Sequence, residues 1–201
     1  MKRLLTGLLV ALSGCMPSPP PPPAEQLDAQ ILAVEYTSED EIRSPLGDLV
    51  VPLPEQWSLL PPSPELVEGT VGLALDSTLT MALVVQRIPP TAAIEATRDV
   101  RTIARVCFER RLQRTGNTIR AMSSFGIVGR DSLRIGTYEF IETLPTDTTY
   151  RKRTRVGVIP TATGAVYELS LTPIVLTLDR NTDERQLDSV FRFFLQIVRV
   201  R

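Results

Sequence analysis

Hydrophobic residues between positions 49 and 88 follow patterns typical of β-strands. The segment LVVPLPEQWSLL (49–60) predicts a strand, a turn at residues 54–56 and a second short strand. Its prolines, Pro52 and Pro54, favour the edge of a sheet, since proline cannot donate a ladder hydrogen bond. Further strands are predicted at residues 71–77 and 79–88, paired as a hairpin. The apolar run from Met81 to Val85 indicates a strand buried on both faces.

A helix is predicted after Pro89 and Pro90, which end the last of these strands. Thr91 is a suitable N-cap, and Gly116 suits the position just after a helix C-terminus. The apolar residues at approximately helical spacing between them are Ile94, Val100, Ile103, Val106, Cys107 and Leu112. This stripe indicates one helical face turned towards a core.

The second half of the chain predicts more strands and a final helix. Short strands are predicted in TIRAMSS and FGIVGR, and longer ones at residues 132–143, 150–160 and 165–172, the last three forming a meander. Asn181 and Glu184 resemble a capping box. The apolar residues that follow at helical spacing are Leu187, Val190, Phe191, Phe194, Leu195 and Val198. This last helix must pack on an apolar surface, and the meander is the obvious one.

The N-terminus carries the pattern of a secretory signal peptide. Lys2 and Arg3 precede an apolar segment at residues 4–12, which is shorter than the roughly 20 residues needed to cross a bilayer. The tetrapeptide LSGC that ends at Cys15 resembles the bacterial lipobox. That resemblance implies cleavage before Cys15 and lipidation of its thiol. An ordinary cleaved signal and an uncleaved anchor are the alternatives.

Proline dominates the residues after Cys15. Residues 16–24 are expected to form an extended polyproline II tether that reaches roughly 28 Å, at about 3.1 Å per residue. The predicted organisation is a signal peptide at 1–14, a lipidated cysteine and tether at 15–24, an acidic linker at 25–47 and a folded domain at 48–201. Met16, rather than aspartate, follows the cysteine. By analogy with Gram-negative sorting, this favours the periplasmic face of the outer membrane.

Composition narrows the possible chemistry. The 201 residues suit one domain, and 43% hydrophobic residues exclude a largely disordered chain. The sequence contains no histidine, which removes the commonest general base and metal ligand. The net charge of −1 provides no field to attract nucleic acid. We therefore expect no enzyme activity, metal, cofactor or nucleic-acid partner.

Two features remain as candidates for binding or reactivity. Arg151, Arg153 and Arg155 share one face of a predicted strand, where they would bind a partner or pair with Glu139 and Glu142 on the preceding strand. The other cysteine, Cys107, lies on the apolar helical stripe. It is interpreted as a buried, inert thiol, with a reactive or intermolecular thiol as the alternative.

The order of these segments resembles the PsbP-like, or Mog-type, family over residues 48–198. VPLPEQWSL resembles the family's P-x-x-W opening, followed by the buried strand MALVVQRI and a helix. The meander GTYEFIE, RTRVGVIPT and AVYELSLT leads to the aromatic helix LDSVFRFFLQIV. The resemblance implies an α+β fold, an α/β/α sandwich in which a central antiparallel sheet is flanked by two main helices. It implies no common chemistry, and no functional residue transfers by motif. Its relatives include assembly factors, photosystem accessory proteins, GTPase-binding modules and bacterial lipoproteins.

Together these observations predict a membrane-anchored envelope lipoprotein. It would act as a non-enzymatic binding or accessory module with a protein partner, held on membrane lipid through Cys15. The alternative function is a carrier or scavenger of a small apolar or anionic ligand, bound in a pocket between helix and sheet.

Overall fold

The computed structural model describes residues 25–26, 40–116, 118–121, 125–130, 132–144, 147–174 and 184–201. The predicted signal peptide, Cys15, the tether and most of the acidic linker lie outside these residues, as does Asn181. Within the part of the chain that is described, no helix combines the length and the apolar character needed to cross a membrane.

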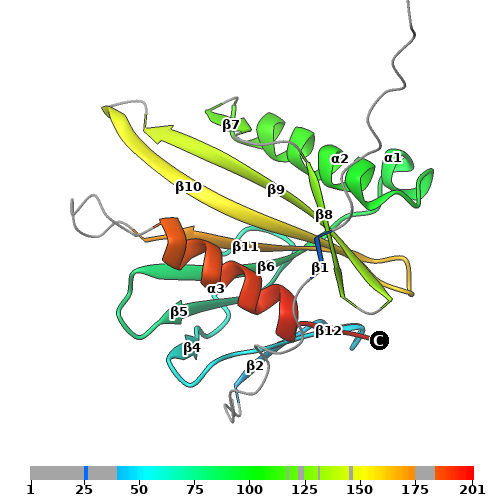
Figure 1. Ribbon diagram of the computed structural model, residues 1–201, viewed down its shortest axis with the longest axis horizontal. Helices are drawn as coiled ribbons and strands as arrows, with labels where there is room; N and C mark the ends of the chain where they lie inside the picture. Colours follow the sequence, from blue (N-terminus) through cyan, green and yellow to red (C-terminus); the bar gives the residue numbers. More distant parts are fainter. Residues whose placement is uncertain are drawn as a thin grey trace, which may run out of the picture.

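A large sheet forms the centre of the molecule (Figure 1). Its strands lie in the order β1-β8-β9-β10-β11-β6-β5-β4, and β7 also pairs with β9. All neighbours are antiparallel except β1, which runs parallel to β8. The strands are β1 (Glu25–Gln26), β4 (Trp57–Leu59), β5 (Thr70–Asp76), β6 (Met81–Ile88), β7 (Ile119–Ala121), β8 (Gly126–Arg130), β9 (Leu133–Leu144), β10 (Asp147–Pro160) and β11 (Val166–Pro173). The predicted meander, the β5–β6 hairpin and the doubly buried β6 are confirmed.

Helices cover both faces of this sheet (Figure 1). They are α1 (Ala92–Glu95), α2 (Val100–Arg114) and α3 (Glu184–Ile197). The single helix predicted after Pro90 is therefore two helices, because the chain makes a new N-terminus at Asp99. The Asp99 carboxylate accepts hydrogen bonds from the backbone N–H groups of Arg101 and Thr102. The predicted cap residues at the outer ends, Thr91 and Gly116, are confirmed.

Each face of the sheet carries its own hydrophobic core. Side chains alternate along a strand, so Val156 and Val158 of β10 join the core beneath α1 and α2, whereas Ile159 joins the core beneath α3. The predicted apolar stripe of α3 enters this second core, where Phe194 packs edge-on against Trp57 with ring centroids 5.0 Å apart. The prediction of a central antiparallel sheet flanked by two main helices, α2 and α3, is confirmed.

A small second sheet lies on the α3 side and consists of β12 (Arg199–Val200), β3 (Leu49–Pro52) and β2 (Glu41–Arg43). Its middle strand is β3, which corrects the edge position predicted from the prolines. Pro52 is tolerated there because β12 pairs only with Leu49 and Val50, so Pro52 has a neighbour on β2 alone. Ile42 of β2 is buried in the core. The described fold therefore includes residues before the domain start predicted at position 48.

Candidate functional site

Two of the three arginines predicted as a binding surface on β10, Arg153 and Arg155, form ion pairs within the fold. Arg153 donates two hydrogen bonds to one carboxylate oxygen of Glu139, at 3.0 and 2.6 Å. Arg155 lies 3.3 Å from the other oxygen of Glu139 and pairs with Asp188 of α3. The side chains of Arg153 and Arg155 are only 23% and 13% exposed. Both are therefore engaged in holding β9, β10 and α3 together; the Arg151 side chain lies outside the described set.

Cys107 is buried in the core beneath α2, as predicted. Burial raises the pKa of its thiol far above the ordinary value, and the nearby Glu168 carboxylate raises it further. A thiol held in this neutral form is a poor nucleophile. The predicted burial of Cys107 is confirmed.

A buried ionic network lies between α2 and the sheet. The guanidinium of Arg111 donates to Glu168 at 2.5 Å, to Ser170 at 3.0 Å and to the Tyr138 hydroxyl at 3.2 Å. Tyr138 in turn donates to the second oxygen of Glu168 at 2.7 Å. Burial, together with the charge of Glu168, raises the pKa of Tyr138. Because Tyr138 and Glu168 are almost completely buried, this network joins helix to sheet and is closed to a substrate.

A second buried carboxylate, Asp48, organises the start of the domain. It accepts hydrogen bonds from four hydroxyl groups at 2.6–2.9 Å. Their donors are Ser44, Thr161, Thr163 and Tyr167. Burial raises the pKa of Asp48, but these hydrogen bonds more than offset that effect and hold the pKa well below its usual range. Asp48 therefore fixes the loop before β3 against the β10–β11 turn.

We expect Asp48 to make stability depend on pH. Its pKa is lower in the folded chain than in the unfolded chain, so its contribution is complete above the unfolded value of about 4 and is lost as pH falls below it. Asp48→Asn is expected to lower the free energy of unfolding at pH 7 by about 1–2 kcal/mol and to flatten its decline between pH 5 and 3. Urea titrations followed by circular dichroism at several pH values measure both. Glu65→Gln, at an exposed position, is the control; a D48N curve as steep as the parent curve would contradict the assignment.

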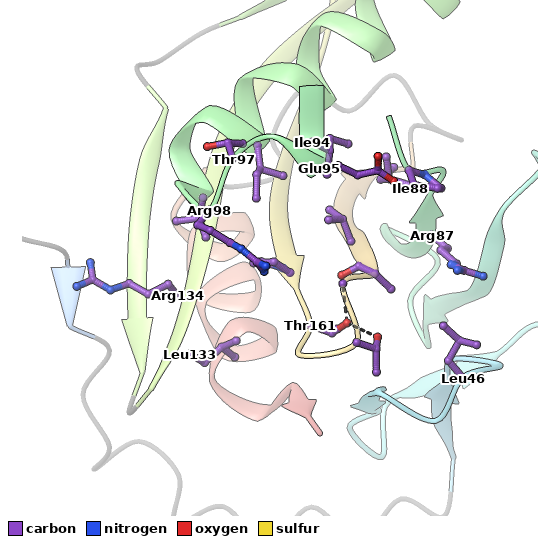
Figure 2. Close-up of a pocket in the computed structure, with 18 of the residues that line it drawn as sticks. Leu46, Arg87, Ile88, Ile94, Glu95, Thr97, Arg98, Leu133, Arg134 and Thr161 are labelled. Carbon is purple, nitrogen blue, oxygen red and sulfur yellow. Dashed lines mark hydrogen bonds between the residues drawn. The ribbon is translucent and has the colours of Figure 1, made fainter. Parts of the chain in front are cut away.

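A cavity of about 600 Å³ lies between the helical layer and one end of the sheet (Figure 2). Two of the hydroxyl residues that donate to Asp48, Thr161 and Thr163, line it. Four parts of the chain build it: the loop at Leu46, the end of β6 with α1 and the start of α2, the β8–β9 turn, and the β10–β11 turn. Residues that line it on the apolar side are Ile88, Ile94, Val100, Ile103 and Val166. Val100 lies close to the sheet because residue 136 of β9 is glycine: a Cβ on Gly136 would lie 2.5 Å from the carbonyl oxygen of Val100.

Charged residues of this cavity are mainly cationic. Arg87, Arg98 and Arg134 line it, against a single carboxylate among its lining residues, Glu95. Figure 2 shows Arg98 extending from the turn between α1 and α2 across the cavity, with Arg87 on the opposite side and Arg134 pointing away. The sequence pattern did not identify this site, because its lining comes from separate segments. The apolar lining residues look like ordinary core positions, and the arginines look like ordinary surface positions.

Metal chemistry has no obvious ligand set in the described ranges, which contain no group of three or more Cys, Asp or Glu residues placed to hold an ion. The cavity with its arginines is therefore the better candidate site, and its chemistry is that of binding an anion.

No family model and no curated protein sequence matches this chain. Solved structures do match. Cyanobacterial PsbP (CyanoP) from Synechocystis sp. PCC 6803 superposes with a TM-score of 0.53 at 11% identity, covering 81% of this chain and 92% of CyanoP. The Ran-binding protein Mog1p from Saccharomyces cerevisiae superposes with a TM-score of 0.56 at 11% identity, covering 80% and 94%.

The chain therefore has a PsbP/Mog1-like fold. This confirms the fold that the order of strands and helices predicted. At 11% identity the likeness extends to the fold alone. Function must be argued from the residues of this chain and their arrangement.

Proposed function

We propose that this protein is a bacterial envelope lipoprotein, held on a membrane through lipid on Cys15, that acts by binding rather than by catalysis. The observation that carries the binding function is the cavity of about 600 Å³ flanked by arginines, a volume typical of ligand sites. The fold is compatible with such a role, since Mog1p is named for binding Ran. The N-terminal lipobox pattern supports the anchor, and Met16 favours the periplasmic face of the outer membrane.

Two surfaces compete for the partner in this proposal. The first is the cavity mouth, where Leu46 is 53% exposed. The second is the β10 surface at Arg151, Arg153 and Arg155. We favour the cavity mouth because Arg153 and Arg155 already pair with carboxylates of the same fold. A carrier of a small apolar or anionic ligand is the second candidate function, favoured by the apolar lining of the cavity.

The anchor is tested by Cys15→Ala. We expect this variant to move from the membrane fraction to the soluble fraction of the native host, because the acyl chains supply the membrane affinity. Mass spectrometry of the mature parent protein should show lipid on an N-terminal cysteine. A C15A variant that stays with the membrane, or a parent N-terminus without lipid, would contradict the anchor.

The binding surface is tested by photo-crosslinking of the full chain in its native host. A photoreactive amino acid replaces Leu46 at the cavity mouth, Arg151 on β10, or Val67, which is 62% exposed in the β4–β5 loop and serves as the control. We expect a specific product from position 46 and none from position 67. A product from position 151 alone would move the site to β10. The absence of any product above the control would contradict a protein partner at either surface.

A further inference from the structure

The cavity combines an apolar floor with a polar rim. Its floor consists of Ile88, Ile94, Val100, Ile103 and Val166, which are all buried. Its rim consists of exposed residues, among them Arg87, Arg98 and Glu95. A ligand seated here would meet hydrocarbon at one end and guanidinium groups at the other. Sites of this kind orient a ligand through a few polar groups at the edge of an apolar surface.

Arg87 and Arg98 are exposed and line the cavity, where a ligand can reach them. Among the residues that the structure describes, neither forms an ion pair, in contrast to Arg111, Arg153 and Arg155. An arginine side chain presents planar N–H donors that match the oxygens of a phosphate or carboxylate. Arg98 reaches across the opening of the cavity (Figure 2), so a bound anion would lie directly against it.

Nearby acidic groups are largely occupied by other partners. Asp48, beneath the cavity, accepts hydrogen bonds from four hydroxyls. Asp99 accepts from the first turn of α2 and from the Thr102 hydroxyl. Among the lining residues Glu95 is the carboxylate, against three arginines. Arg87 and Arg98 together therefore outweigh Glu95 in charge among the side chains that line the cavity.

We propose that this cavity binds one amphiphilic anion, with a phosphate or carboxylate head on Arg98 and Arg87 and its apolar part on the isoleucine and valine floor. This inference rests on the proposed binding function and names the chemical class of the ligand. The volume of about 600 Å³ admits an amphiphile of moderate size and leaves no room for a folded partner. Such a molecule comes either from a membrane or from solution.

Three probes separate the contributions of the anionic head and of the apolar chain in isothermal titrations of the full chain carrying Cys15→Ser. The probes are lysophosphatidylglycerol below its micelle concentration, lysophosphatidylcholine with the same acyl chain, and inorganic phosphate. We expect saturable one-to-one binding of lysophosphatidylglycerol, and binding at least about tenfold weaker for the other two. Tenfold corresponds to about 1.4 kcal/mol, the scale of one charge-assisted hydrogen bond.

Arg98→Glu is expected to weaken lysophosphatidylglycerol binding at least about tenfold, since it places a carboxylate where the anionic head would lie. Arg87→Glu is a second, independent variant, and both positions are exposed, so the fold should persist. Arg120→Glu makes the same charge reversal at an exposed position of β7, outside the cavity, and should leave binding unchanged. Circular dichroism confirms folding for each variant.

Several results would overturn the inference. Equal binding of both lysolipids would mean that the arginines do not select an anion. Phosphate binding as tight as that of the lysolipid would mean that the apolar floor contributes nothing to affinity. If R98E and R87E bind the lysolipid as R120E does, the ligand does not bind in this cavity. If no probe binds while crosslinks still form at position 46, the ligand class is wrong and the binding function stands. If the lysolipid binds and no crosslink forms at position 46, the ligand class stands and the protein partner at the cavity mouth is wrong.

Discussion

Replacing Arg111 by methionine is expected to destabilise the protein by about 3–5 kcal/mol. The substitution keeps an unbranched side chain of similar length but removes the cation that compensates Glu168. Glu168 is 1% exposed and would remain as an unpaired carboxylate beneath α2. The cation–π contact of Arg111 with Phe140, at 5.2 Å, is lost as well. Urea denaturation followed by circular dichroism measures the change in the free energy of unfolding.

A double variant separates the lost charge pair from lost packing. Adding Glu168→Gln to Arg111→Met removes the unpaired charge and leaves an acceptor for the Tyr138 hydroxyl, so we expect much of the stability to return. Arg105→Met is the matched control on the same helix, because Arg105 is exposed and its guanidinium lies over the ring of Phe125, 5.7 Å from the ring centroid. It should cost at most about 1 kcal/mol. If R111M is no more damaging than R105M, the network contributes little to stability.

The second large effect is expected at Gly136 of β9, which packs directly against the backbone of α2. An added Cβ would lie 2.5 Å from the carbonyl oxygen of Val100 and 3.0 Å from the Ala104 side chain. Both obstacles belong to the first turns of α2, so Gly136→Ala must push the helix away from the sheet. We expect a loss of about 1–3 kcal/mol in the free energy of unfolding.

Gly129 of β8 offers the control for this substitution. Its added Cβ would meet nothing within 4 Å, and it lies in the same sheet. Gly129→Ala is therefore expected to be neutral or to stabilise by up to about 1 kcal/mol, through the unfolded chain. Thermal and urea unfolding of both variants check the pair. Similar losses at positions 129 and 136 would show that β propensity, not helix contact, sets the cost.

Periodicity predicted much of the fold because burial leaves a local signature. Leu187, Phe191 and Phe194 recur at helical spacing because α3 buries one face. The break at Asp99 was missed because the apolar stripe continues across it, from Ile94 to Val100. A local signal for the break exists: Asp99 is a strong N-cap residue placed just before the apolar positions of α2.

Predicting the site was harder, because its parts meet only in three dimensions. Nothing in the sequence distinguishes Arg87 and Arg98 from Arg153 and Arg155. The first two line a cavity, whereas the other two form ion pairs with carboxylates of the fold. Asp48 likewise lies at the predicted boundary between linker and domain, with no local sign of a role, although hydroxyls from residues more than 100 positions away donate hydrogen bonds to it. Side-chain pairing over such separations has no local pattern from which it can be read.

The small sheet has a consequence for the order in which the chain acquires its structure. Its middle strand, β3, is flanked by β2 from the start of the domain and by β12 from residues 199–200, and the N–H of Arg201 donates to the carbonyl oxygen of Asp48 at 3.0 Å. This sheet therefore stays incomplete until the last strand has been synthesised. Contacts over such long sequence separations slow folding. A chain exported in the unfolded state, as the proposed signal peptide requires, benefits from that delay because it remains competent for translocation.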